Sequence, residues 1–298
     1  MKWLWLIVGV VVLALLATRN LRRAAPGQPP PGPITAARSL ESCDRPQGFQ
    51  AAARRNAASL ASAPWAPFGV PETGWDAYAP SIAHEIRTGC GPTTAGFAAA
   101  LARWQKDHKL SPTGEVEANT FEAMRVAWML RRPFVTATRD GSCPAEPAPG
   151  VLAPSRPDEG YFGKVVQLRP GALAAYRRLR EAARREVPAV QADPALLALV
   201  SGYRSAATDA ERCRTQACGG PARANCSAHR TGLAVDLYLG AAPGHDPISS
   251  AEPNRSYQAA TPAYRWLVAN AERFGFVPYP YEPWHWEWTG EPVVNSPS

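Results

Sequence analysis

The stretch "CSAHRTGLAVDL", residues 226–237, restricts the fold more than any other part of the sequence. It contains His229 and Asp236, seven residues apart. In a helix these side chains would be separated by about 10 Å along the axis, too far to share one metal ion. In one straight strand, an odd separation would turn them to opposite faces. Gly232 lies between them and permits a sharp change of direction, so we expect a turn followed by a strand.

The segment after this turn, "LAVDLYL" at residues 233–239, has the pattern of a buried strand. Asp236 would share one face with Ala234 and Tyr238, and aliphatic side chains would fill the other. Asp236 is the only strongly charged residue in the run, and a buried carboxylate needs a cation or hydrogen-bond donors. Two interpretations stay open for the pair: a structural Asp bound to an Arg with a surface His, or a metal site.

A second motif, "YEPWHWEW" at residues 281–288, favours the metal site. Pro283 predicts a turn that can aim Glu282 and His285 at one point. Tryptophans at every second position alternate with His285 and Glu287, which is the period of a strand. His285 and Glu287 would therefore share a face.

Together the two motifs supply the ligands of a catalytic zinc ion. His229, Asp236 and His285 provide two imidazoles and a carboxylate, which leaves a fourth position open for water. Zinc lowers the pKa of bound water to about 7, and a nearby carboxylate can accept its proton. We assign Glu282 as this base. Glu287 is the alternative base, or else a hydrogen-bond acceptor behind a ligand. His245, in the loop "PGHDP", is an alternative ligand.

The short motif "SGYRS", residues 201–205, follows a buried apolar run and adds a cation. The guanidinium of Arg204 is a rigid fork of donors that could bind a terminal carboxylate or stabilise an oxyanion. The alternative is a surface Arg in an ordinary salt bridge. We also count Tyr203, beside it in the motif, among the substrate-binding residues.

These three motifs, in this order, resemble those of the zinc D-Ala-D-Ala carboxypeptidases of the vancomycin-resistance type (VanY-like) over residues 161–290. That family shares its metal-site fold with lysostaphin-like endopeptidases and the hedgehog signalling domain. The resemblance implies a zinc ion, a Glu base, an Arg that stabilises substrate or transition state, a Ser that binds substrate, and two structural small residues. By this resemblance, His229, Asp236 and His285 bind the zinc ion and Glu282 is the base. Arg204 stabilises the substrate or transition state, and Ser227 binds the substrate. Gly232 and Ala234 are the structural residues.

The sequence departs from the family pattern at two places near the expected substrate entrance. The family often has a Gln five residues after the motif Arg, where this chain has Asp209. The segment at 213–226 contains cysteines where relatives have a short Gly/Pro loop. Both departures bear on the substrate more than on the chemistry.

Two proline-rich stretches divide the sequence into parts. We expect a signal peptide or membrane anchor at 1–23, a spacer at 24–40, a helical domain at 41–142, a linker at 143–160 and the zinc carboxypeptidase domain at 161–298. The fold class is α+β: a small antiparallel sheet with flanking helices carries the zinc site, and a small all-helical domain precedes it.

Helical periodicity is clear in both folded parts. In the first, residues 93–110 predict a helix capped by Thr93 or Thr94, and residues 119–128 predict another capped by Asn119 or Thr120. In the second, 171–187 and 261–275 predict helices around a short strand at 195–203. The predicted buried positions are Phe97, Leu101, Trp104, Phe121, Met124, Trp128, Leu173, Tyr176, Leu179, Ala183, Tyr264, Leu267, Val268 and Ala271.

The first of these parts also resembles the peptidoglycan-binding helical repeat of wall hydrolases. That pattern has an aromatic–Gln pair, a Leu, a turn Gly, a Thr and an apolar residue. The corresponding positions are Trp104, Gln105, Leu110, Gly114, Thr120 and Met124. The resemblance implies wall binding; the alternative is a helical bundle without a ligand.

Charge and cysteine content indicate the compartment. The chain has a net charge of +7 but no nucleic-acid-binding motif, so we expect an anionic wall polymer or membrane surface rather than nucleic acid as partner. Six cysteines behind an apolar N-terminal run indicate disulfides and export to the periplasm or cell envelope. At least one bond would join the two halves. A metal cluster of Cys213, Cys218 and Cys226 is the alternative.

The N-terminal run at residues 3–17 is short for a membrane span, and no clear cleavage site follows it. It is either a cleaved signal or an anchor in the inner membrane. Arg19, Arg22 and Arg23 after the run would, by the positive-inside rule, keep the body in the cytoplasm. We give more weight to the cysteines and the site chemistry, which favour export.

The function expected from these features is zinc-dependent removal of the terminal D-Ala from peptidoglycan stem peptides. An L,D-carboxypeptidase or endopeptidase with the same site is the alternative within the enzyme class. A wall-binding protein with a vestigial site is the alternative outside it.

Overall fold

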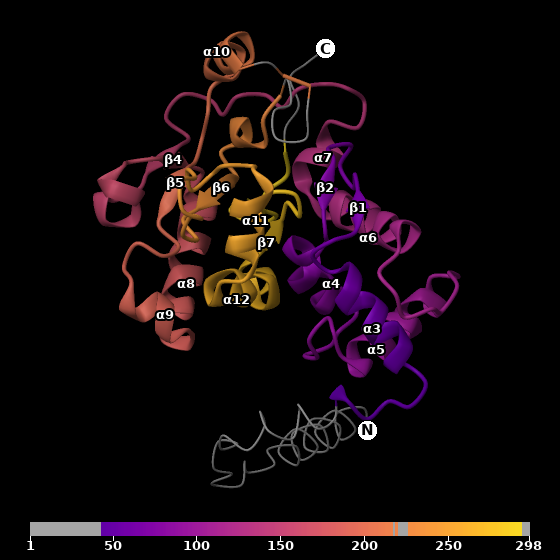
Figure 1. Ribbon diagram of the computed structural model, residues 1–298. Coiled ribbons are helices and arrows are strands. Elements are labelled where there is room, and N and C mark those ends of the chain that lie inside the picture. Colours follow the sequence, from indigo (N-terminus) through magenta and orange to yellow (C-terminus); the bar gives the residue numbers. More distant parts are fainter. Residues whose placement is uncertain (1–42, 217, 220–225, 294–298) are drawn as a thin grey trace, which may run out of the picture. The chain divides into compact units, whose positions relative to one another are not determined.

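The computed structural model describes residues 43–216, 218, 219 and 226–293, all within one compact unit at 39–298. The predicted signal or anchor at 1–23 and the spacer at 24–40 lie outside the described residues. Helices combine with small antiparallel sheets, which confirms the α+β class (Figure 1). Within the described ranges, every helix falls short of the length and apolar character needed to cross a membrane.

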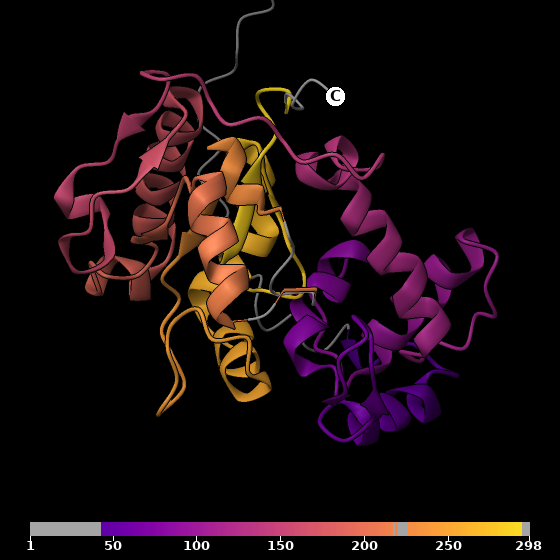
Figure 2. The ribbon, with the colours of Figure 1, turned by 90° about the horizontal axis from the view of Figure 1, so that it is seen from above.

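The first part of the chain is mainly helical (indigo to magenta in Figures 1 and 2). Its elements are α3 (Gln50–Ser59), β1 (Pro64–Trp65), β2 (Glu72–Thr73), η1 (Asp76–Tyr78), α4 (Ala79–Glu85), α5 (Ala95–Asp107), α6 (Ala118–Arg131) and α7 (Pro133–Ala137). The Thr94 hydroxyl caps α5 by accepting from the Phe97 amide, as predicted. The predicted caps of α6 are wrong: the helix begins earlier, after Glu117, without a side-chain cap.

The residues of the wall-binding pattern build the interior of this part. Gln105 is fully buried, and its amide nitrogen donates to the Thr113 and Thr120 hydroxyls at 3.2 and 3.0 Å. Its oxygen accepts from the amide of Gly114, which adopts a left-handed φ of 71° in the turn before α6. Trp104 is also buried. Gln105 of the aromatic–Gln pair therefore links α5 to the following turn and to α6 through hydrogen bonds.

The second part carries a four-stranded antiparallel sheet in the order β5-β6-β8-β7. Its strands are β5 (Leu199–Ser201), β6 (Ala234–Leu237), β7 (Phe276–Pro278) and β8 (His285–Trp288), and a separate hairpin joins β3 (Ala153–Pro154) to β4 (Gln167–Leu168). The helical elements are η2 (Pro157–Glu159), η3 (Tyr161–Gly163), α8 (Pro170–Glu186), α9 (Pro188–Ala192), α10 (Ala206–Gln216), η4 (Ala228–Thr231), α11 (Glu252–Ala259), α12 (Pro262–Asn270) and η5 (Ala271–Phe274).

Sequence periodicity locates the core of this second part well. The predicted stripe of α8 is buried throughout, and that of α12 is buried except for the half-buried Val268. Thr261 caps α12 as predicted, but the helix ends at Asn270. The short η5 follows and ends before Gly275, which has a left-handed φ of 82°. The strand expected at 195–203 is confirmed at its centre only.

Buried ion pairs join the helical part to the second part. Arg255 of α11 lies 3.1 Å from Glu72 of β2, and both side chains are nearly inaccessible to solvent. A carboxylate oxygen of Glu252 accepts from the Thr73 amide at 2.9 Å. The domain boundaries at 142 and 161 stay a prediction.

Three disulfides use all six cysteines: Cys43–Cys90, Cys143–Cys226 and Cys213–Cys218. The second joins the two halves of the chain, as the count of three per half required. The alternative of a metal cluster at Cys213, Cys218 and Cys226 is wrong, because each of these sulfurs is in a disulfide.

Candidate active site

The sheet brings together the three residues predicted to bind metal. Asp236 of β6 and His285 of β8 are register partners, so their side chains stand on the same face. His229 lies in η4, and Gly232 ends that turn in the left-handed region at φ 70° before β6 begins. This is the geometry that the spacing of His229 and Asp236 required. One ligand atom from each of the three residues lies within 4.8 Å of the others, and all three side chains are buried.

Hydrogen bonds orient the two imidazoles of this candidate metal site. His229 Nδ1 lies 2.7 Å from the Gly202 carbonyl oxygen, so it carries the proton and its Nε2, 3.2 Å from Asp236 Oδ2, is left with a lone pair. His285 Nδ1 lies 3.0 Å from Asp236 Oδ1. His285 Nε2 is buried and has no hydrogen-bond partner among the described residues. Two nitrogens and one carboxylate facing a common point are a donor set that fits zinc.

The charges in this cluster are strongly coupled. Burial would raise the pKa of the Asp236 carboxyl, but the two imidazoles outweigh burial and hold that pKa well below its usual range. Burial lowers the pKa of His229. Burial lowers the pKa of His285, but Asp236 and Glu287 outweigh burial and raise this pKa to about 9. Without a metal ion, Asp236 is therefore ionised and His285 is protonated, so binding a divalent ion would release a proton from His285.

Glu287 supports His285 from behind. Its Oε1 lies 3.6 Å from His285 Nε2 and 2.6 Å from Arg132 Nε, and its Oε2 accepts from the Phe134 amide at 3.0 Å. Burial would raise the pKa of Glu287, but Arg132 and His285 lower it to about 2. A carboxylate held this way is a poor proton acceptor. The geometry therefore favours its alternative role behind a predicted ligand, here as the ion-pair partner of His285.

Glu282 lies in the turn between β7 and β8, three residues before His285. The turn is closed by two backbone hydrogen bonds, from the Glu282 amide to the Tyr279 carbonyl and from the His285 amide to the Glu282 carbonyl. Burial and the nearby Asp236 outweigh the neighbouring cations and raise the pKa of Glu282 to about 7. That value suits a group that accepts and returns a proton near neutral pH.

A cavity of about 400 Å³ is lined by the three predicted metal ligands and by Glu282, Arg204 and Ser227. Tyr203 was predicted to bind substrate, but it is not among the described residues that line the cavity. Its hydroxyl donates to Glu146 Oε1 at 3.1 Å. His245 lies in the loop after β6 and is not part of the metal-binding group.

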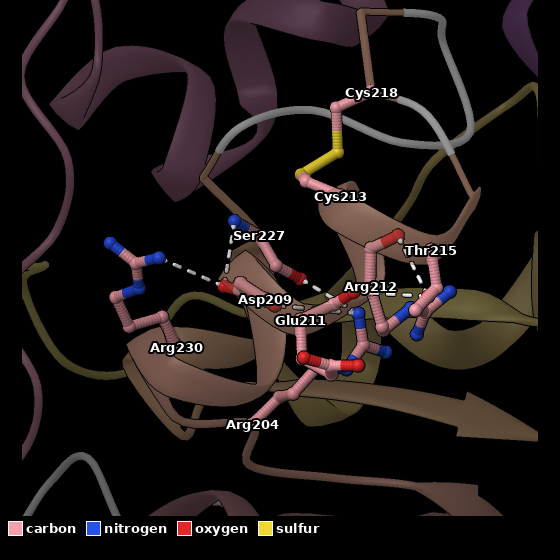
Figure 3. The surroundings of a disulfide bond; sticks show 9 residues. All are labelled: Arg204, Asp209, Glu211, Arg212, Cys213, Thr215, Cys218, Ser227 and Arg230. Atoms are coloured by element: carbon pink, nitrogen blue, oxygen red, sulfur yellow. Dashed lines mark hydrogen bonds and ion pairs between the residues drawn. A yellow bond between two sulfur atoms is a disulfide. The ribbon is translucent and has the colours of Figure 1, made fainter.

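Asp209, the position where the family often has Gln, lines the same cavity and contacts Arg204, Ser227 and Arg230 (Figure 3). It is buried in the first turn of α10. Its Oδ2 lies 3.1 Å from Arg230 Nη2 and accepts from the Ser227 amide at 3.3 Å. Its Oδ1 lies 3.7 Å from Arg204 Nη1, which donates to the Ser227 hydroxyl at 3.4 Å. One carboxylate thus holds two arginines and a serine together.

Sequence reasoning missed the supporting roles of Asp209 and Arg132. Asp209 was visible only as a departure from a family pattern. Arg132 lies in the helical part, far along the chain from Glu287, and no local pattern marks it. A buried Glu beside a predicted ligand was the one available signal that a distant cation was needed.

Comparison with known proteins agrees with the motifs and the geometry. Residues 166–291 match the family model of VanY, described as D-alanyl-D-alanine carboxypeptidase. No curated protein matches the chain significantly. The matched region contains every predicted metal ligand together with Glu282, Arg204 and Ser227. Residues 166–291 of this chain therefore form a domain of the VanY family of D-alanyl-D-alanine carboxypeptidases.

Proposed function

We propose that this protein is an exported zinc peptidase that removes the terminal D-Ala from peptidoglycan stem peptides. The family match supports a peptidoglycan hydrolase of the D-Ala-D-Ala carboxypeptidase type. The observation that carries the finer assignment is the convergence of His229, Asp236 and His285 beside Glu282, in the same cavity as Arg204.

His229, Asp236 and His285 would hold the zinc ion, which would supply an acidified water and polarise the scissile carbonyl. Glu282 accepts a proton as the water attacks the carbonyl and returns it to the leaving amine. Because the pKa of Glu282 is near neutral, both transfers are feasible.

Arg204 and Ser227 bind the substrate in this proposal. Arg204 is largely buried, so its positive charge attracts a carboxylate or oxyanion more strongly than an exposed Arg would. A terminal carboxylate bound to Arg204 favours an exopeptidase over an endopeptidase. Ser227 offers its hydroxyl beside the guanidinium.

The related specificities differ in product. A D,D-carboxypeptidase releases one D-Ala from a pentapeptide stem, an L,D-carboxypeptidase releases D-Ala from a tetrapeptide, and an endopeptidase cuts cross-links. Purified muropeptides of each kind, digested with and without a chelator and analysed by mass spectrometry, separate these outcomes. Release of D-Ala from the pentapeptide, abolished by the chelator, is the expected result; undiminished hydrolysis by a Glu282→Ala variant rejects the mechanism.

Export and wall attachment complete the proposal. Three disulfides support an oxidising compartment such as the periplasm. Binding of the wall by residues 41–142 is proposed from the resemblance alone, since the motif residues are explained by internal contacts. A sacculus pull-down with Glu282→Gln tests it. Binding by an unmutated protein that shows no turnover would instead favour the non-catalytic alternative.

A further inference from the structure

The helical part of the chain supplies one wall of the active-site cavity. Met129 at the end of α6, and Phe134 and Val135 in α7, line the same cavity as the metal ligands. All three side chains are apolar and half-buried, so they present their surface to the cavity. None of them belongs to the region that matches the VanY family.

This apolar wall and Arg204 lie on opposite sides of the metal-binding group. Arg204 follows β5, which pairs with β6 at one edge of the sheet. The ligands Asp236 and His285 stand on β6 and β8. Among the strands of this sheet, α7 contacts β8, where the Phe134 amide donates to Glu287. Across the sheet, the order is therefore the cationic Arg204, the metal ligands, and then the apolar wall.

A substrate that bridges these sides has a defined direction. With its terminal carboxylate on Arg204 and its scissile carbonyl at the metal, the residues on the acyl side of that bond extend toward α7. We infer that Met129, Phe134 and Val135 form the subsite for the aliphatic side chains on the acyl side of the scissile bond. This inference rests on the proposed function. Its ligand class is a peptide with a methyl or methylene-rich side chain at those positions.

The wall is held rigidly enough to serve as a subsite. Arg132, between Met129 and Phe134, is 5% exposed, pairs with Glu287 at 2.6 Å and lies over the Tyr279 ring at 3.9 Å from its centroid. Arg132 also lines the cavity between the apolar residues, with its charge paired by Glu287. The Cys143–Cys226 disulfide joins the segment after α7 to the residue next to Ser227. Subsites work best on elements fixed by such contacts.

The test compares two substrates and matched variants of neighbouring residues. Phe134→Ala and Val135→Ala remove wall atoms but keep the Phe134 amide that binds Glu287. Leu130→Ala and Val126→Ala remove similar atoms from positions of α6 that are 51% and 45% exposed and lie outside the cavity. The substrates are diacetyl-L-Lys-D-Ala-D-Ala, which has an acyl-side methylene chain, and D-Ala-D-Ala, which lacks it.

We expect each wall variant to lower kcat/KM for the tripeptide about tenfold, mainly through KM, the scale of losing a methylene contact in an apolar pocket. Hydrolysis of the dipeptide should change less than twofold, and zinc content should not change. The controls should match the unmutated protein. Equal losses on both substrates, or no loss on either, overturn the inference.

A separate binding experiment tests the subsite if the proposed function is wrong. If the unmutated protein hydrolyses neither substrate, calorimetry compares tripeptide binding to Glu282→Gln and to Glu282→Gln/Val135→Ala. Weaker binding of the tripeptide by the double variant supports the subsite, and equal affinity overturns it. Val135→Thr, of nearly the same shape, replaces Val135→Ala if that variant loses its native circular dichroism.

Discussion

The two sides of the active-site cavity are built differently. The proposed metal-binding side consists of residues on paired strands and the turn before them, and His229, Asp236 and His285 are at most 4% exposed. The proposed substrate side consists of Arg204 and Ser227 on connecting segments, held by Asp209 of α10 through contacts of 3.7 and 3.3 Å. Strand register positions the predicted metal ligands, whereas a buried carboxylate and a disulfide-bonded segment position the proposed substrate-binding groups. Mutations on the two sides should therefore have different effects on kcat, KM and stability.

The largest effect on activity is expected at the base. Glu282→Gln keeps the shape of the side chain but cannot accept a proton, so kcat should fall about 10³-fold while KM and zinc content stay unchanged. Steady-state kinetics on a pentapeptide muropeptide measures this. A variant that retains full kcat would show that another group, such as Glu287, is the base.

Breaking the support of His285 should cost stability as well as activity. Arg132→Met leaves the Glu287 carboxylate buried without its cation, which should lower the free energy of unfolding by about 3 kcal/mol. Denaturant titration of the metal-free protein measures it. The double variant Arg132→Met/Glu287→Gln should recover part of the loss, because no unpaired charge remains. A double variant less stable than Arg132→Met would contradict this account.

On the substrate side, Asp209→Asn should affect binding rather than chemistry. Without the carboxylate charge, Arg230 and Arg204 lose their common anion, and we expect KM to rise about tenfold with kcat within threefold, the cost of one charged hydrogen bond. Glu211→Gln, an exposed change on the same helix (Figure 3), is the matched control. A fall in kcat with unchanged KM would place Asp209 in the catalytic step instead.

The smallest effect is expected at Arg212, which lines the cavity and is half-buried. Arg212→Gln should raise KM about threefold at low salt and less at 0.5 M salt, since solvent screens a partly exposed charge. Kinetics at the two ionic strengths measures it. A salt-independent effect would indicate a direct, desolvated contact with substrate.

The way each part of the site is built also explains which residues could be predicted from the sequence. The predicted metal ligands lie in two short motifs whose turn and strand geometry follows from Gly232, Pro283 and the alternation of residues. The choice of a metal site over a structural Asp then rested on the second motif and on the family resemblance. The residues that support the predicted ligands could not be predicted in this way. Arg132 reaches Glu287 across 155 positions of sequence, and only the packing of α7 against β8 brings them together. Side-chain pairing between distant segments leaves no periodic signal.

Helix prediction shows a similar limit. The buried faces of α5 and α8 were predicted because apolar spacing is a property of the segment itself. The start of α6 was not, because Glu117 does not cap the helix and the preceding turn is held by Asn56, which accepts from the Val116 amide. Again the deciding contact comes from a distant residue.

The most direct test of this account is the zinc content of three purified proteins after dialysis against metal-free buffer: the unmutated chain, His285→Ala and His245→Ala. We predict about one zinc per chain in the unmutated protein and in His245→Ala, and a small fraction of that in His285→Ala. Equal zinc content in all three would show that the group of His229, Asp236 and His285 does not hold the ion.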